Sequence, residues 1–223
     1  MIDFAAARRM MVDSQIRPND VTDFRLIEAM REIPREHFIS SLKAGMAYFD
    51  IDLPVGQTTR EHPARCLLKP MVLAKLLQAA DISENDRVLD IGCTTGYSSA
   101  IISRLANSVV ALEEDADLAG TASRLLANIG ARNVNVVTGP LSAGWIAGAP
   151  YDVILLNGAS DIEPRQLFDQ LKEGGRFVGI VGRAPLGKAM LYRVAHGHIS
   201  GRAIFDASAP LLPGFAVPTA FVF

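Results

Sequence analysis

The sequence predicts a single Rossmann-like α/β domain, in which helices cover both faces of a mainly parallel sheet. Three observations support this prediction. From residue 71 onward, apolar segments typical of buried strands alternate with segments of helical periodicity. One apolar segment, 87–91, leads into a turn with glycines at 92 and 96 and then a helix; ligands of open α/β sheets bind where strands end in this way. The composition, 49% hydrophobic and 21% charged over 223 residues, is typical of one globular domain.

The first 46 residues are expected to form an N-terminal helical part. Apolar residues recur there at helical spacing in two segments, which are separated by a break at Arg17-Pro18. Thr22 and Asp23 are suitable caps for the second helix. Residues 47–70 are rich in Gly, Pro and Thr, and we expect an irregular active-site loop there, because loops of this length in compact domains are usually functional.

Residues 71–223 are expected to form the Rossmann-like core. Its helices are predicted at 71–80, 97–106, 117–129 and 164–171. Its main strands are predicted at 87–91, 108–112, 134–138, 151–156 and 176–181, with Gly174 and Gly175 turning into the last of them. Further short strands at 189–195, 201–205 and 220–223 predict an antiparallel edge added to the parallel sheet.

Charge and composition argue against nucleic acid and membranes as partners. The net charge is −2 and the sequence pI is about 6.1, so the chain lacks the excess of positive charge that is typical of nucleic-acid-binding proteins. No apolar stretch reaches the roughly 20 residues of a membrane helix, and the amino terminus lacks the apolar segment of a secretion signal. Cys66 and Cys93 have neither disulfide nor zinc spacing, so we expect reduced thiols, no metal site and a cytoplasmic protein. The oligomeric state stays open.

The turn at residues 90–97, with the sequence D-I-G-C-T-T-G-Y, is expected to bind the cofactor. A dinucleotide fingerprint G-x-G-x-x-G would need glycines at 94 and 97, where the chain has Thr94 and Tyr97. The methyltransferase pattern acidic-x-G-x-G-x-G keeps Asp90, Gly92 and Gly96 and loses only its middle glycine. A methyltransferase fold therefore fits better than an NAD-binding one.

Two further positions support a nucleoside ligand at this turn. Glu113 and Glu114 follow the next strand, where Rossmann-type folds place a carboxylate on ribose hydroxyls. Acids at the start of a helix also interact favourably with the helix dipole, so a purely structural role for Glu113 and Glu114 stays an alternative. Asn157 ends the strongest apolar strand, at the same edge of the sheet, and could equally be an ordinary turn asparagine.

Beyond this turn, the sequence resembles the protein-L-isoaspartate O-methyltransferase family. The likeness includes an opening helix, a second helix with the P-R-E-H-F turn, a G-Q-T segment, the cofactor loop with its Gly-Tyr pair, and several later motifs in the same order. The resembling segments are 9–18, 27–38, 47–58, 88–97, 143–145, 151–154 and 171–176.

The resemblance implies an S-adenosylmethionine-dependent methyltransferase fold and a definite reaction. The methyl group of S-adenosyl-L-methionine would pass to the carboxylate of isoaspartyl residues in damaged proteins, which is a repair reaction. The catalytic residues implied are Thr58, Thr59 and Arg60. The cofactor-binding residues implied are Asp90, Gly92, Cys93, Thr94, Gly96, Glu113, Glu114, Gly139, Pro140 and Asn157.

Three positions depart from the family pattern. Arg60 stands where the family has a serine, and the alternative alignment through Lys69-Pro70 puts Leu68 there instead. Thr94 replaces the middle glycine of the cofactor loop. Pro140 replaces the acid that accepts the adenine amino group. These departures leave two alternatives open: methylation of a different carboxylate acceptor, or a non-catalytic binding protein.

Overall fold

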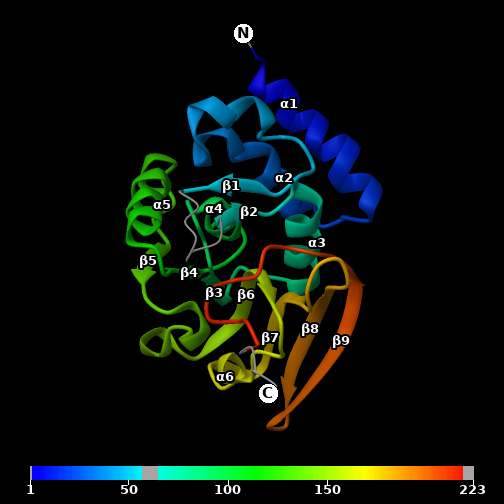
Figure 1. Ribbon diagram of the computed structural model, residues 1–223, viewed down its shortest axis with the longest axis vertical. Helices are drawn as coiled ribbons and strands as arrows, with labels where there is room; N and C mark the ends of the chain where they lie inside the picture. The colour runs from blue at the N-terminus through cyan, green and yellow to red at the C-terminus, as the bar shows by residue number, and fades with distance from the viewer. Residues whose placement is uncertain (1, 57–64, 218–223) are drawn as a thin grey trace, which may run out of the picture.

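Seven strands form one sheet in the order β5-β4-β3-β6-β7-β8-β9 (Figure 1). The computed structural model describes residues 2–56 and 65–217. The strands from β3 to β7 are parallel to their neighbours, whereas β8 and β9 add an antiparallel edge, as predicted. The strands are β3 (Arg87–Ile91), β4 (Ser108–Glu113), β5 (Val134–Thr138), β6 (Tyr151–Ser160), β7 (Leu171–Val181), β8 (Lys188–Ala195) and β9 (His198–Asp206).

The N-terminal part is helical and leads into a short separate pair of strands. Asp23 caps the second helix as predicted, because its side chain accepts hydrogen bonds from the backbone N–H groups of Arg25 and Leu26. The helical run that begins with α1 continues as a π-helical and then a 3₁₀ segment and ends at Asn19, next to the break predicted at Arg17-Pro18; Asp20 after it is left-handed. The elements are α1 (Phe4–Met11), η1 (Val12–Ile16), η2 (Arg17–Asn19), α2 (Phe24–Glu32), η3 (Arg35–Phe38), η4 (Ser41–Met46), β1 (Leu53–Val55) and β2 (Arg65–Leu67).

The remaining helices cover both faces of the sheet. The N-terminal helices, α3, α4 and α5 bury one apolar face, and α6, η5 and the C-terminal segment bury the other. Alternate residues of each strand therefore enter two separate cores, as expected of a buried parallel sheet. These helices are α3 (Pro70–Ala80), α4 (Tyr97–Ile102), α5 (Ala116–Asn128), η5 (Leu141–Ala143), η6 (Ile146–Gly148) and α6 (Arg165–Phe168).

Several sequence predictions differ from the structure. The segment 47–70 is not wholly irregular, because β1 and β2 pair antiparallel within it. The helix expected at 164–171 is only four residues long, because the carbonyl of Gln170 accepts the N–H of Tyr151 and β7 begins at the next residue. Gly174 and Gly175 lie inside β7 at an irregularity in its pairing with β6, not in a turn before it. The strand predicted at 220–223 lies outside the described residues.

The chain after β9 folds back over the carboxyl ends of the central strands (Figure 1). Leu211 forms a parallel bridge with Ala159 near the end of β6. The N–H of Leu212 donates to the carbonyl of Ala159, and the N–H of Ala159 donates to the carbonyl of Pro210. The C-terminal segment thus borders the edge of the sheet at which ligands of this fold class bind.

Candidate active site

The turn after β3 has the backbone shape of a ligand-binding loop. Gly92 and Gly96 have φ values of +80° and +97°, a region that favours glycine. Thr94, which replaces the middle glycine of the methyltransferase pattern, also has a positive φ, +53°. A β-branched residue is strained in this conformation. The backbone therefore keeps a glycine-type conformation at 94 although the side chain has changed.

Asp90 is a fully buried acid at the end of β3. The hydroxyls of Ser98 and Ser99 each donate to its Oδ2 at 2.6 Å. Burial raises the pKa of Asp90 to about 6, against the lowering effect of these two hydrogen bonds. The side-chain amide of Asn157, from β6, donates to the hydroxyl of Ser98 at 2.7 Å and so joins the same group.

Two acceptor atoms in this group remain open. Oδ1 of Asp90 and Oδ1 of Asn157 are buried and have no hydrogen-bond partner among the residues that the structure describes. Unpaired buried acceptors are uncommon and often mark a place for a ligand donor. Because both lie beside Ser98, one ligand group with several N–H donors could serve them together.

Glu113 is the second buried acid and ends β4. Its Oε2 accepts the N–H of Thr94 at 2.8 Å and Nη2 of Arg65 at 3.0 Å. Its Oε1 accepts the N–H groups of Glu114 and Asp115 at 2.9 and 3.3 Å. Of the predicted acidic pair, Glu113 enters the site, whereas the side chain of Glu114 is exposed.

Two residues that the sequence did not single out lie against this turn. A Cβ built on Gly92 would lie 2.7 Å from Nη2 of Arg65 and 3.4 Å from the side chain of Leu212. The same leucine fills the space beside Gly158, where an added Cβ would lie 2.6 Å from it. Arg65 falls within the loop predicted to carry the active site, which was the only sequence signal; nothing local indicated Leu212.

The other predicted cofactor residues lie at the same edge of the sheet. The N–H of Gly139 donates to the carbonyl of Glu113 at 3.1 Å, so the end of β5 adjoins the end of β4. Pro140 follows and is exposed. Cys93 is fully buried, and burial raises the pKa of its thiol well above the usual value, which favours a packing role over a nucleophilic one.

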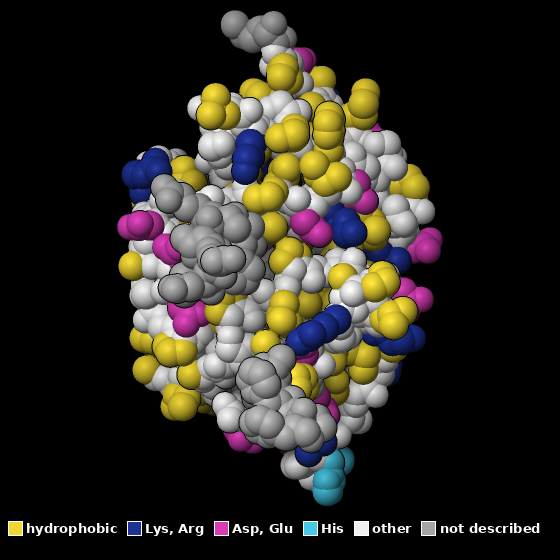
Figure 2. Space-filling view, viewed as in Figure 1, with side chains coloured by type: hydrophobic (Ala, Val, Ile, Leu, Met, Phe, Trp, Pro, Cys, Tyr) yellow, Lys and Arg dark blue, Asp and Glu magenta, His cyan; other side chains and the backbone are white. Residues whose placement is uncertain are grey.

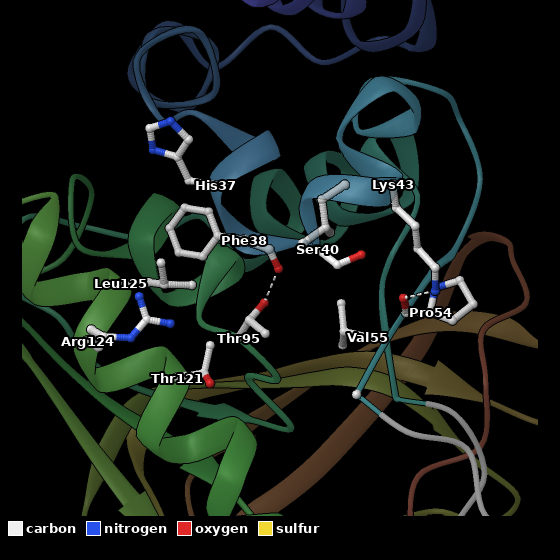
Figure 3. A pocket seen from close by; sticks show the side chains of 12 residues that line it. His37, Phe38, Ser40, Lys43, Pro54, Val55, Thr95, Thr121, Arg124 and Leu125 are labelled. Carbon is white, nitrogen blue, oxygen red and sulfur yellow. Dashed lines mark hydrogen bonds between the residues drawn. The ribbon is translucent and has the colours of Figure 1, made fainter.

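A cleft of about 330 Å³ lies on the other side of the same turn (Figure 3). Thr95 lines it, and its hydroxyl donates to the carbonyl of Phe38 at 2.6 Å. Figure 3 shows Arg124 of α5 and Lys43 of η4 on opposite sides of the cleft, and no acid lines it among the described residues. Gly56, at the end of the β1 segment, also borders it; the predicted catalytic residues Thr58, Thr59 and Arg60 follow directly in the sequence and lie outside the described residues.

Comparison with known proteins identifies the family. The model of the family described as "Protein-L-isoaspartate(D-aspartate) O-methyltransferase (PCMT)" matches residues 6–203. The chain belongs to this family. Among the relatives, the protein-L-isoaspartate O-methyltransferase of Koribacter versatilis is 37% identical over 91% of this chain and 89% of its own length. That of Syntrophus aciditrophicus is 39% identical over 80% of this chain and 79% of its own.

Solved structures agree with the assignment. A protein-L-isoaspartate O-methyltransferase superposes with a TM-score of 0.81 and 27% identity over 93% of this chain, which spans 66% of that one. The fold also matches a putative family member from Plasmodium falciparum, solved in complex with S-adenosyl-L-homocysteine, with a TM-score of 0.76, 15% identity, and coverage of 92% of this chain and 97% of that one.

Family membership confirms several predictions from the sequence: the methyltransferase fold, the family, the class of S-adenosylmethionine-dependent carboxyl O-methyltransferases, and its cofactor. The roles of individual site residues stay predictions. Among the described residues, no helix is long and apolar enough to cross a membrane, and no group of side chains is arranged to hold a metal ion.

The residues of the turn fit only one end of S-adenosylmethionine in this conformation. The open acceptors of Asp90 and Asn157 suit the amino group at its methionine end. At the predicted ribose end, both oxygens of Glu113 are already engaged, and Arg65 and Leu212 lie against Gly92. At the predicted adenine end, Pro140 offers no carboxylate. The site as described therefore does not fit the whole cofactor.

Proposed function

We propose that this chain is a protein-L-isoaspartate O-methyltransferase, which transfers a methyl group from S-adenosyl-L-methionine to isoaspartyl carboxylates in damaged proteins. The observation that carries the proposal is the position of the turn at residues 92–96. On one side it contacts the buried acids Asp90 and Glu113 through Thr94 and the start of α4. On the other side Thr95 lines a basic cleft. A cofactor site and an acceptor site would thus share one loop.

The charge of the cleft suits an acidic acceptor. Lys43 and Arg124 contribute positive charge, and no acid among the described residues lines the cleft to oppose them. Lys43 is held by a hydrogen bond of 2.9 Å to the carbonyl of Pro54, whereas the exposed Arg124 has no hydrogen bond or ion pair within the described ranges 2–56 and 65–217. Its guanidinium is therefore free to pair with a carboxylate.

The surroundings of the cleft suit a polypeptide. Leu42 is 96% exposed and Phe49 is 57% exposed, and both are close to Lys43 in sequence. Figure 2 shows hydrophobic side chains gathered on the upper part of one face, over the helical N-terminal part, with acidic and basic side chains interspersed elsewhere. An unfolded or damaged segment with exposed apolar side chains could bind such a surface more readily than a small, fully polar acid.

The reaction requires little acid–base catalysis from the protein. A carboxylate is ionised near neutral pH and is already a nucleophile, so no general base is needed. The protein then acts by holding the acceptor in place and excluding water, and positioning alone can supply a large part of the rate enhancement. Thr58, Thr59 and Arg60 remain the residues predicted to hold the acceptor, and the cytoplasmic location likewise stays a prediction.

The proposal is tested by methyl transfer to a matched pair of peptides. One peptide carries an isoaspartyl residue and its control carries aspartate at the same position. We expect kcat/KM to be at least about 100-fold higher for the isoaspartyl peptide, which corresponds to discrimination by roughly 3 kcal/mol. Equal rates would support the alternative of another carboxylate acceptor. Binding of S-adenosylhomocysteine without any methyl transfer would support the non-catalytic alternative.

A further inference from the structure

We propose that Arg65 is a built-in competitor of the cofactor: its guanidinium holds Glu113, and S-adenosylmethionine binds only after the guanidinium has withdrawn. The inference rests on the proposed function, because it takes Glu113 as the carboxylate that faces the cofactor ribose.

The hydrogen-bonding capacity of Glu113 is the first argument. An ionised carboxylate has about four lone-pair positions on its two oxygens. In this chain four donors use them: the N–H groups of Thr94, Glu114 and Asp115, and Nη2 of Arg65. The side chain is fully buried, so water does not extend this capacity. Ribose hydroxyls can reach the carboxylate only if one donor leaves.

Arg65 is the donor that can leave. The three N–H groups belong to the backbone of the cofactor turn and of the segment directly after β4, and these are fixed by the main sheet. Arg65 instead comes from β2, which pairs with β1 in a separate two-stranded sheet and, among the described residues, with no strand of the main sheet. Its Nε is buried and has no hydrogen-bond partner among the described residues, so the guanidinium is incompletely satisfied where it lies.

The position of the guanidinium is the second argument. Nη2 lies 2.7 Å from the place of a Cβ on Gly92, a glycine whose bare backbone normally allows a ligand to approach. The side chain of Leu212 lies beside both glycines, 3.4 Å from the place of a Cβ on Gly92 and 2.6 Å from that of a Cβ on Gly158. Arg65 and Leu212 thus occupy the two places, in the turn after β3 and near the end of β6, where a glycine would leave room for a ligand.

The expected consequence is a weakened apparent affinity that mutation can restore. If the open form is a fraction of the population, the apparent Kd rises by the inverse of that fraction. Because the Arg65–Glu113 contact is buried and charge-assisted, we expect the open form to be roughly one tenth of the population. Arg65→Ala should then lower the Kd for S-adenosylhomocysteine about tenfold. Leu212→Ala should lower it several-fold without changing any charge.

The test is calorimetric titration of S-adenosylhomocysteine into the wild-type chain and three variants. Arg176→Ala is the matched control, because Arg176 also forms a mostly buried ion pair, with Asp86, but before β3, at the opposite end of the strand from the cofactor turn. We expect tighter binding for Arg65→Ala and Leu212→Ala and unchanged binding for the control. Circular dichroism establishes that each variant is folded before titration.

The outcomes separate this inference from the proposed function. Wild-type binding with no tightening in folded Arg65→Ala would overturn the competitor role and leave the proposed function standing. If Arg65→Ala does not fold, Leu212→Ala decides, and unchanged affinity in it overturns the inference. Tightening of the Arg176→Ala control by the same factor would also overturn it, since the effect would then be general loosening. No binding by any variant at millimolar ligand would overturn both proposals.

Discussion

The buried carboxyl of Asp90 should make the protein less stable as pH rises. Its pKa is raised from 3.8 to about 6 by burial, so the folded chain holds this proton more tightly than the unfolded chain. Between these two pKa values the folded state binds more protons, and the free energy of unfolding falls with increasing pH. The full effect of a shift of about two units is roughly 3 kcal/mol.

Asp90→Asn removes this titration with little change in shape. An asparagine oxygen can still accept both serine hydroxyls that now donate to Oδ2. Between about pH 5 and about pH 8 the wild-type carboxyl should lose about 1.4 kcal/mol of stabilisation, because its folded-state pKa lies within that interval. The variant should lack this part of the pH dependence and be the more stable protein at about pH 8.

Urea denaturation of both proteins at the two pH values measures the effect. The difference between wild type and variant cancels the titration of all other groups that the substitution leaves unchanged. Asp152→Asn is a control without titration in this interval: although burial opposes it, the hydrogen bond from Lys172 lowers the pKa of Asp152 from 3.8, so its carboxyl is ionised at both pH values and its replacement should leave the change in stability between them as in wild type. Parallel pH profiles for wild type and Asp90→Asn would refute the reasoning.

Three further predictions concern the fold, the cofactor turn and the cleft. Arg35 is fully buried and donates to two backbone carbonyls, so Arg35→Met should lower the free energy of unfolding in urea by about 2–4 kcal/mol; a loss below about 1 kcal/mol would contradict this. Thr94→Gly should stay within about 1 kcal/mol of wild type, because relief of backbone strain offsets the added chain entropy. In the same assay Gly96→Ala should cost about 2 kcal/mol or more, since its φ is +97° and its Cβ would lie 3.1 Å from Leu126; equal costs for these two variants would contradict the strain argument. Arg124→Glu should raise KM for an isoaspartyl peptide about three- to tenfold and leave kcat unchanged, whereas an unchanged KM in steady-state kinetics would place the acceptor elsewhere.

The central sheet could be predicted from the sequence because its signals are local. The apolar segment 87–91 and the glycines at 92 and 96 indicate a strand and a turn without reference to the rest of the chain. The predictions that failed concern elements whose bounds are set by contacts with residues far away in the sequence. The helix expected at 164–171 is short because Tyr151 pairs with this segment from another strand, a contact that periodicity cannot reveal.

The same distinction applies to the site. Asp90 and Glu113 were predicted because strand ends in this fold class meet at one edge. The burial of these two carboxylates and the hydrogen-bond donors that they accept from depend on three-dimensional packing. The same packing decides that Glu113, rather than Glu114, faces the site. Arg65 and Leu212 reach the turn from segments that are 48 residues before and 99 residues after Glu113, so no local pattern could connect them to it.

The most direct test of the central claim is a crystal structure of the chain with S-adenosylhomocysteine. The claim is that the edge formed by Asp90, Glu113 and Asn157 is the cofactor site and that Arg65 closes it. We predict ribose hydroxyls within about 3 Å of the Glu113 carboxylate and the guanidinium of Arg65 withdrawn from it. Ligand bound elsewhere, or bound at this edge with the Arg65–Glu113 ion pair intact, would contradict the claim.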